Sequence, residues 1–165
     1  MLEENRGMTL RPVALPTDVP GKLWLSSMPG RFGPWHAFDS EARRAQLALV
    51  VCLTPRHEVA ELSPAYHAAL DQGTLPFRWQ NLPMPNFGLP QDPPAFRRDI
   101  AQIAQALRQG DAVMLHCAAG LGRTGTAAAC VLKALGLDQA EALDRVRAAG
   151  SNPQNAKQSG LVGWF

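Results

Sequence analysis

Residues 116–125 place a thiol, an arginine and three glycines within ten positions of the chain. Cys117 stands six residues before Arg123, and a hydroxyl side chain, Thr124, follows the arginine. A thiol beside an arginine at the start of a helix ionises more readily than a free thiol, so we expect Cys117 to be a thiolate nucleophile. Arg123 carries a planar fork of donors that matches two oxygens of a phosphate group. These residue types at this spacing predict a site that binds a phosphate group and attacks its phosphorus.

The residues between the cysteine and the arginine are suited to binding a phosphate group through their backbone. The two glycines allow positive φ or a close approach of the main chain to a ligand. We expect the phosphate oxygens to accept hydrogen bonds from the amides of these intervening residues, which are Ala118, Ala119, Gly120, Leu121 and Gly122.

Two polar neighbours of this stretch are predicted to support it. Thr124 places a hydroxyl where it could hydrogen-bond the thiolate and later stabilise that thiolate as a leaving group when water attacks. His116 is interpreted as a residue that orients the loop backbone, not as a proton donor.

The stretch lies between signals for a strand and a helix. Residues 112–115 form a short apolar run, and a helical pattern over 124–135 ends before Gly136. In a strand, glycine loop and helix sequence, backbone amides converge on an anion with the positive end of the helix dipole behind them. We therefore predict a phosphate-binding loop between a central strand and a helix.

His116, Cys117, Arg123 and Thr124 match the His-Cys-x5-Arg-Ser/Thr signature of the cysteine-dependent phosphatases. The chain resembles that superfamily and is most similar to its small dual-specificity branch. The resemblance covers nearly the whole chain: residues 20–30 are similar to the first strand and turn, 81–90 to the acid loop and 154–158 to a Gln-x3-Gln stretch. It implies a protein-tyrosine or dual-specificity phosphatase that works through a phosphocysteine on Cys117, with Gln154 positioning the hydrolytic water.

One position departs from the family pattern. Where the family carries an aspartic acid that protonates the leaving group, this chain has Asn86, and an amide cannot supply that proton. Asp92 could substitute as the acid, but an aspartate directly before two prolines at a helix start is also a good N-cap. Two functions thus remain: an enzyme, which we favour, and a pseudo-phosphatase that binds phosphorylated partners with little or no turnover.

Cys52 is a candidate for redox control. It lies at the end of the strand predicted within the apolar run 47–53, and similar phosphatases place there a cysteine that traps the oxidised nucleophile as a disulfide. The alternative interpretation is a small buried hydrophobic residue.

Composition places limits on partners and location. The 165 residues carry 16 basic and 14 acidic side chains, a net charge of +2 that is too small and dispersed for a nucleic-acid surface. No apolar run approaches a membrane span, and the acidic N-terminus is unlike a signal peptide. Three cysteines indicate a reducing compartment, so we predict a cytoplasmic protein. The cysteine and histidine spacings predict no metal site, and we expect no cofactor.

The substrate prediction depends on the loop residues Ala118, Ala119 and Leu121. They are uncharged, whereas relatives that take inositol phosphates tend to carry lysines there. A phosphorylated protein or an aryl phosphate is therefore the preferred substrate. The oligomeric state is left open.

The remaining patterns predict one compact α/β domain over residues 1–165, with 1–20 as an extended N-terminal segment. Apolar runs at 47–53 and 112–115 are typical of buried parallel strands. Helical patterns alternate with them, which favours a central, mostly parallel, twisted sheet flanked by helices. The expected helices span 40–46, 58–72, 93–109, 124–135 and 138–149.

Overall fold

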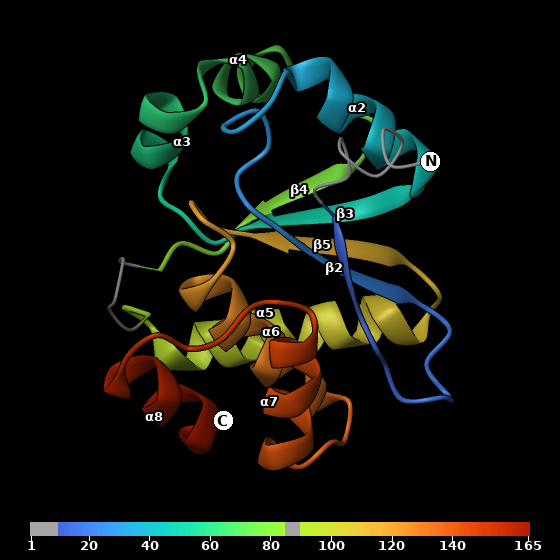
Figure 1. Ribbon diagram of the computed structural model, residues 1–165, viewed down its shortest axis with the longest axis vertical. Coiled ribbons are helices and arrows are strands. Elements are labelled where there is room, and N and C mark those ends of the chain that lie inside the picture. The colour runs from blue at the N-terminus through green and yellow to red at the C-terminus, as the bar shows by residue number, and fades with distance from the viewer. Residues whose placement is uncertain (1–9, 85–89) are drawn as a thin grey trace.

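The computed structural model describes residues 10–84 and 90–165, which form a five-stranded sheet in the order β1-β2-β5-β3-β4 (Figure 1). The strands are β1 (Arg11–Val13), β2 (Lys22–Ser26), β3 (Leu47–Cys52), β4 (Arg78–Asn81) and β5 (Ala112–His116). β1 pairs antiparallel with β2, and every other pairing is parallel. The prediction of a mostly parallel sheet with 112–115 at its centre is confirmed.

Helices cover both faces of this sheet. One face carries α2 (Trp35–Arg44), α3 (Arg56–Leu62) and α4 (Pro64–Gln72), and the other carries α5 (Pro93–Arg108), α6 (Gly122–Ala134), α7 (Gln139–Ala148) and α8 (Ala156–Trp164). Figure 1 shows the first group above the sheet and the second below it. This is the expected α/β architecture.

Alternation along β5 divides its side chains between the two layers. Val113 and Leu115 join the large core under α5 and α6, whereas Met114 belongs to the core under α2. Successive side chains of a strand point to opposite faces. His116 therefore faces the α3 and α4 layer, and Cys117 belongs to the core on the α6 side.

Several predicted boundaries were wrong. The single helix expected over 58–72 is two helices, because the Ser63 side chain accepts a hydrogen bond from Tyr66 N (3.4 Å) and Pro64 occupies the first turn of α4. The helix expected at 40–46 begins at Trp35, directly after Pro34. Part of the segment expected to be merely extended, at 11–13, pairs as β1. β4 and α8 were not predicted at all.

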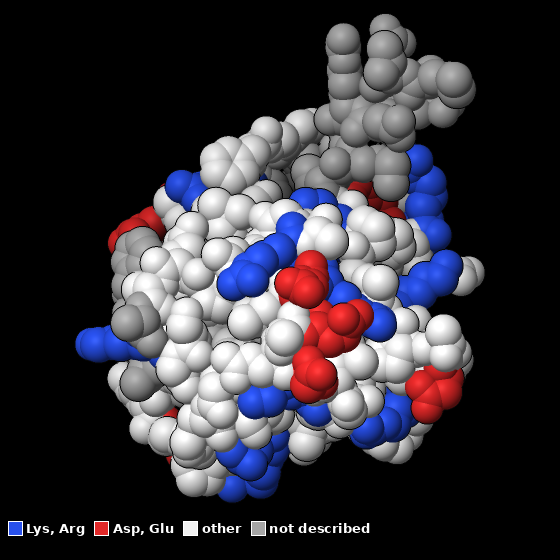
Figure 2. Space-filling view, turned by 60° about the horizontal axis from the view of Figure 1, so that its bottom comes forward, with Lys and Arg blue, Asp and Glu red and all other residues white. Residues whose placement is uncertain are grey.

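The face of the molecule shown in Figure 2 carries charges of both signs. On the face shown in Figure 2, basic and acidic side chains are interspersed among uncharged ones. Within residues 10–84 and 90–165, no helix has the length and apolar character needed to cross a membrane.

Candidate active site

The predicted phosphate loop connects the central strand β5 to the N-terminus of α6. Its residues, 117–121, lie at the carboxyl ends of the parallel strands, the edge where α/β sheets bind ligands. Cys117 stands at the start of this loop and is 3% exposed. Cys117 thus follows directly on the central strand, and the dipole of α6 points toward the same loop.

Two donors converge on the Cys117 sulfur. Thr124 Oγ1 donates to Sγ at 3.0 Å, and the backbone N–H of Gly120 donates at 3.3 Å. Hydrogen bonds to a charged atom favour the charged form. The structure therefore brings Cys117 and Thr124 together, as the sequence predicts.

The loop carbonyls are tied away from the phosphate side. The carbonyl of Cys117 contacts His116 Nδ1 (3.2 Å), that of Ala118 accepts from Arg31 Nη1 (2.9 Å), and that of Leu121 accepts from Asn152 N (3.3 Å). In a planar trans peptide the following N–H points opposite to the carbonyl. Outward carbonyls thus aim the next amides inward, and those amides belong to Ala118, Ala119 and Gly122.

His116 is fixed by a chain of buried hydrogen bonds. Trp79 Nε1 donates to Tyr66 Oη (2.8 Å), so the Tyr66 hydroxyl hydrogen is free to donate to His116 Nε2 (2.8 Å). His116 Nε2 then accepts, and Nδ1–H donates to the carbonyl of Cys117. Burial lowers the pKa of His116 to about 4, which keeps the ring neutral at physiological pH. This geometry supports the interpretation of His116 as a loop orienter.

The guanidinium of Arg123 donates hydrogen bonds to a carboxylate and to a backbone carbonyl. Its side chain is 3% exposed, and its two terminal nitrogens donate to both oxygens of Glu58 at 3.2 and 3.0 Å. Nη1 also donates to the carbonyl of Met84 at 3.1 Å. A bidentate carboxylate sets the plane of a guanidinium as well as neutralising it. Glu58, in the first turn of α3, thus orients the fork of Arg123.

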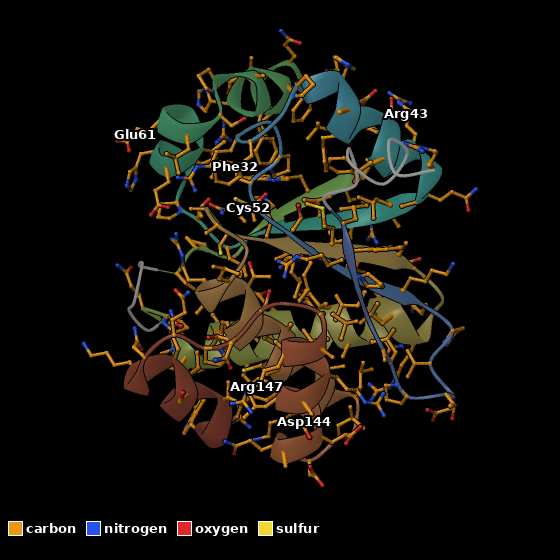
Figure 3. The ribbon with its side chains drawn as sticks, viewed as in Figure 1. Phe32, Arg43, Cys52, Glu61, Asp144 and Arg147 are labelled. Carbon is orange, nitrogen blue, oxygen red and sulfur yellow. The ribbon has the colours of Figure 1, made fainter. Side chains whose placement is uncertain are left out.

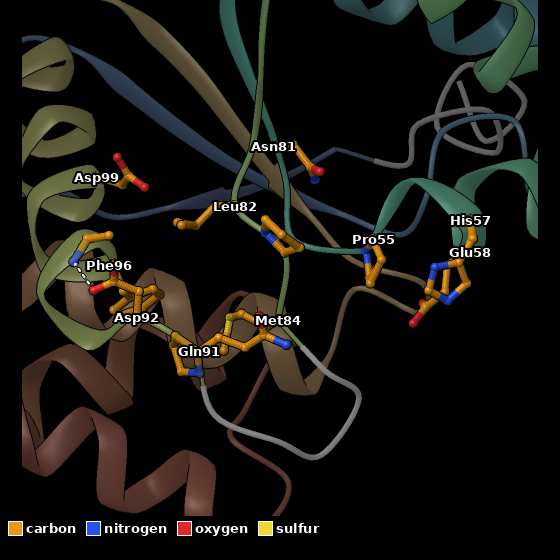
Figure 4. A pocket seen from close by; sticks show the side chains of 13 residues that line it. Pro55, His57, Glu58, Asn81, Leu82, Met84, Gln91, Asp92, Phe96 and Asp99 are labelled. Carbon is orange, nitrogen blue, oxygen red and sulfur yellow. Dashed lines mark hydrogen bonds between the residues drawn. The ribbon is translucent and has the colours of Figure 1, made fainter.

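Asp92 is the N-cap of α5 in this structure. Its Oδ1 accepts a hydrogen bond from Ala95 N at 3.1 Å, and the side chain turns toward the first turn of α5 (Figure 4). The same carboxylate borders a cavity of about 680 Å³ whose far side carries Glu58. The expected capping contact is therefore present. Asn86, the acid-loop position, lies outside the described residues.

Gln154 lies against the start of α6. A Cβ on Gly122 would come within 2.8 Å of Gln154 Oε1 and 2.9 Å of Gln158 Oε1, so a larger residue there would displace these two side chains. Gln158 Oε1 in turn accepts from the backbone N–H of Gln154 at 2.7 Å. The amide predicted to position water thus adjoins the phosphate loop.

Cys52 lies beside the loop but on the other side of the sheet. It pairs in register with His116, and its side chain packs with Met28, Val59 and Tyr66 toward α3 and α4 (Figure 3). Cys52 Sγ contacts Thr54 Oγ1 at 3.2 Å, and burial raises the pKa of Cys52. All three cysteines are unpaired. The side chains of Cys52 and Cys117 thus belong to different hydrophobic clusters, although Cys52 pairs with the residue next to Cys117.

The sequence patterns did not reveal the hydrogen-bond partners of His116. Tyr66 and Trp79 were not singled out for His116, because they stand 50 and 37 residues away from it in the chain. The one signal that could have found them is chemical: a buried histidine before the cysteine needs a hydrogen-bond partner.

Comparison with known proteins identifies the family. Residues 19–159 match the family model described as PTP-SAK, a Swiss Army Knife protein DSP-PTPase phosphatase domain. The chain belongs to this family. It is accordingly a protein-tyrosine/dual-specificity phosphatase of the cysteine-dependent superfamily.

Solved structures of phosphatases share its fold. A kinase-associated phosphatase (KAP) whose catalytic-site cysteine is replaced by serine is 19% identical, with a TM-score of 0.80 over 93% of this chain and 90% of that one. The G95A form of Tk-PTP is 25% identical, with a TM-score of 0.68 over 86% and 87%. Human DUSP28 is 18% identical, with a TM-score of 0.64 over 94% and 93%.

Proposed function

We propose that this phosphatase hydrolyses phosphorylated proteins or aryl phosphates through a phosphocysteine on Cys117. The observation that carries the proposal is the pair of donors, Thr124 Oγ1 and Gly120 N–H, aimed at the Cys117 sulfur within a ring of inward amides. Sulfur is thus prepared both to attack and to leave.

The proposed reaction has two displacements at phosphorus. In the first, the Cys117 thiolate forms an S–P bond as the bond from phosphorus to the leaving oxygen breaks, and that oxygen takes up a proton. In the second, water attacks phosphorus and loses a proton, the S–P bond breaks, and inorganic phosphate is released. Arg123 and the loop amides bind the three peripheral phosphate oxygens in both steps. We place Gln154, beside Gly122, near the attacking water.

The source of the first proton sets the substrate preference. Asn86 cannot supply it, and the observed hydrogen bond of Asp92 uses one of its oxygens as a helix cap. Phenolates leave more readily without protonation than serine or threonine alkoxides. We therefore propose a preference for phosphotyrosine and other aryl esters.

The residues around the loop also favour substrates with one phosphate group. Ala118, Ala119 and Leu121 offer no side-chain charge to a second phosphate, which argues against a polyphosphorylated inositol. A catalytic thiol must stay reduced, so we propose that the protein works in the cytoplasm.

Steady-state and burst kinetics with p-nitrophenyl phosphate test this function. We expect turnover by the native chain, no turnover by Cys117→Ser and strong impairment of Arg123→Lys, because a point charge cannot reproduce the bidentate fork. Tungstate should still bind Cys117→Ser. Turnover in the serine variant would refute the covalent mechanism. Phosphate binding by the native chain without any turnover would instead indicate a phospho-binding module.

A further inference from the structure

Arg11 in the edge strand β1 reaches the phosphate loop from outside the signature motif. Its Nη2 donates to the carbonyl of Gly120, and its Nη1 donates to Ser151 Oγ at 3.0 Å and to the carbonyl of Ala149 at 2.8 Å. Ser151 Oγ itself donates to the carbonyl of Gly120 at 2.6 Å. The Gly120 carbonyl is therefore held by two side chains from distant parts of the chain.

The orientation of this carbonyl decides what the loop offers to a phosphate. Because the peptide is planar and trans, a Gly120 carbonyl held toward Arg11 and Ser151 turns the N–H of Leu121 to the opposite side. The amide on the other side of Gly120 donates to Cys117 Sγ. Gly120 itself adopts φ +76°, which glycine tolerates and other residues rarely do. Without an outside anchor, such a glycine peptide could turn over.

From these contacts we infer that Arg11, together with Ser151, is a positioning residue for the phosphatase reaction: it fixes the Gly120 peptide and adds positive charge behind the Cys117 thiolate. The inference rests on the proposed function of the loop.

The backbone of Gly150 lies close to the guanidinium of Arg11. A Cβ on Gly150 would lie 2.8 Å from Arg11 Nη1, and Gly150 has φ +89°, so the chain passes over the guanidinium at a glycine. Arg11 takes part in none of the ion pairs formed by residues 10–84 and 90–165, whereas Arg123 is paired with Glu58. Its charge is therefore not cancelled by a neighbouring carboxylate.

Electrostatics between Arg11 and the nucleophile agree with this geometry. Burial lowers the pKa of Arg11, and the negative charge of the Cys117 thiolate opposes that shift. Among the described residues, Arg31 also bonds a loop carbonyl, that of Ala118, and the neutral ring of His116 bonds the carbonyl of Cys117. Arg123 at the end of the motif is paired with Glu58. Arg11, contributed by β1, is thus a cation that contacts the loop from outside the signature motif.

Alkylation of Cys117 by iodoacetamide, followed by mass spectrometry across pH, tests the inference without requiring turnover. In Arg11→Met we expect the midpoint of the pH profile to rise by about 1 unit, because an opposite charge near a thiolate has been removed. We also expect tungstate to bind about tenfold more weakly, as for loss of one charge-assisted contact. Arg11→Lys should bring the midpoint of Cys117 alkylation most of the way back to the native value, because the positive charge is kept. It should restore tungstate binding less fully, since one ammonium cannot bond all three acceptors.

Arg145→Met is the matched control. Arg145 also ties the N-terminal segment down, through the carbonyl of Ala14 at 3.1 Å, but it does not contact the loop. It should leave both profiles unchanged, and Ser151→Ala should weaken tungstate binding with little change in the midpoint. Thermal unfolding of each variant confirms that it is folded at the assay temperature.

The outcomes separate this inference from the proposed function. An Arg11→Met profile that superimposes on the native one, or an Arg11→Lys variant that behaves like Arg11→Met in the midpoint, would overturn the role of Arg11. Failure of tungstate to protect Cys117 in the native chain would overturn the phosphate loop itself. Absence of turnover alone would leave the alkylation result standing.

Discussion

At the scale of single residues, His116 shows how burial and hydrogen bonding choose a chemical state. Its ring is fully buried, accepts from Tyr66 and donates to the Cys117 carbonyl, an arrangement that only one neutral tautomer satisfies. A protonated ring would place a second N–H against the Tyr66 hydroxyl, whose own hydrogen would then have to turn away. The loop is therefore held by an imidazole that must stay uncharged.

This requirement predicts a loss of stability in acid. The unfolded chain protonates His116 below about pH 6.5, whereas the folded chain does so only below about pH 4. Between these values the unfolded state binds more protons, so the free energy of unfolding falls as the pH falls, by about 3 kcal/mol for this group. Urea unfolding of the native chain and of His116→Gln at several pH values between 4 and 7 measures it. The variant should be less stable at pH 7, and the difference should narrow toward pH 4; parallel curves would contradict the prediction.

At the scale of elements, the loop is shaped by what packs against the first turn of α6. A Cβ on Gly125 would lie 2.5 Å from Asn152 N, and one on Gly122 would strike Gln154. The signature glycines therefore allow the segment after α7 to pack closely against α6. That segment then supplies Ser151 and Asn152 to the loop carbonyls. The N-terminus of α6 and the loop before it are thus shaped by the segment that packs against them.

The N-terminus of α5 yields a prediction that distinguishes a cap from an acid. Asparagine caps nearly as well as aspartate, so Asp92→Asn should leave stability and p-nitrophenyl phosphate turnover unchanged. Asp92→Ala should lower the free energy of unfolding by about 1 kcal/mol.

A carboxylic acid at position 86 should supply the missing proton. Asn86→Asp should therefore raise kcat for phosphotyrosine, and more for phosphothreonine, while adding a basic limb to the pH profile of the rate. Denaturant unfolding and kinetics with the three substrates measure these effects. If Asp92→Asn instead depresses the poor leaving groups selectively, Asp92 is the acid.

At the scale of the whole molecule, the sheet lies between two groups of side chains that contact the loop and the residues flanking it. The layer of α3 and α4 provides Glu58 and Tyr66, which contact Arg123 and His116, and the side chain of Cys52 on β3 packs against this layer. On the other side of the sheet, the segment after α7 provides Ser151, which contacts the Gly120 carbonyl. Cys117 belongs to one layer and Cys52 to the other, although their strands are neighbours. A disulfide between the two cysteines would therefore link the two layers of the molecule.

Mild peroxide followed by non-reducing peptide mapping tests that coupling. A reversible Cys52–Cys117 disulfide remains our prediction, and tungstate should slow its formation because a ligand holds the loop in place. Cys130, in the buried part of α6, serves as the internal control, since burial raises its pKa to about 12 and keeps it a thiol. A link to Cys130, or over-oxidation of Cys117 with Cys52 untouched, would refute the pairing.

The sequence alone determined the reactive loop and its setting between a strand and a helix. Cys117, Arg123 and Thr124 lie within eight consecutive residues, so their spacing already constrains the contacts that the structure shows. The apolar runs of β3 and β5 likewise predicted central strands, because a strand that is buried on both faces of the sheet has an uninterrupted run of hydrophobic residues. The break at Ser63 was missed because the helical pattern on either side of it is continuous in hydrophobicity.

Tertiary structure decided which distant side chains hold that loop. Arg11 meets Gly120 across 109 residues of chain, Glu58 meets Arg123 across 65, and Tyr66 meets His116 across 50. Such long-range pairs produce no periodic pattern in the sequence, since each depends on the strand order, the strand register and the path of a connecting segment. Local spacing specifies the groups that react, and packing of the two layers specifies how rigidly and with what charge they are presented.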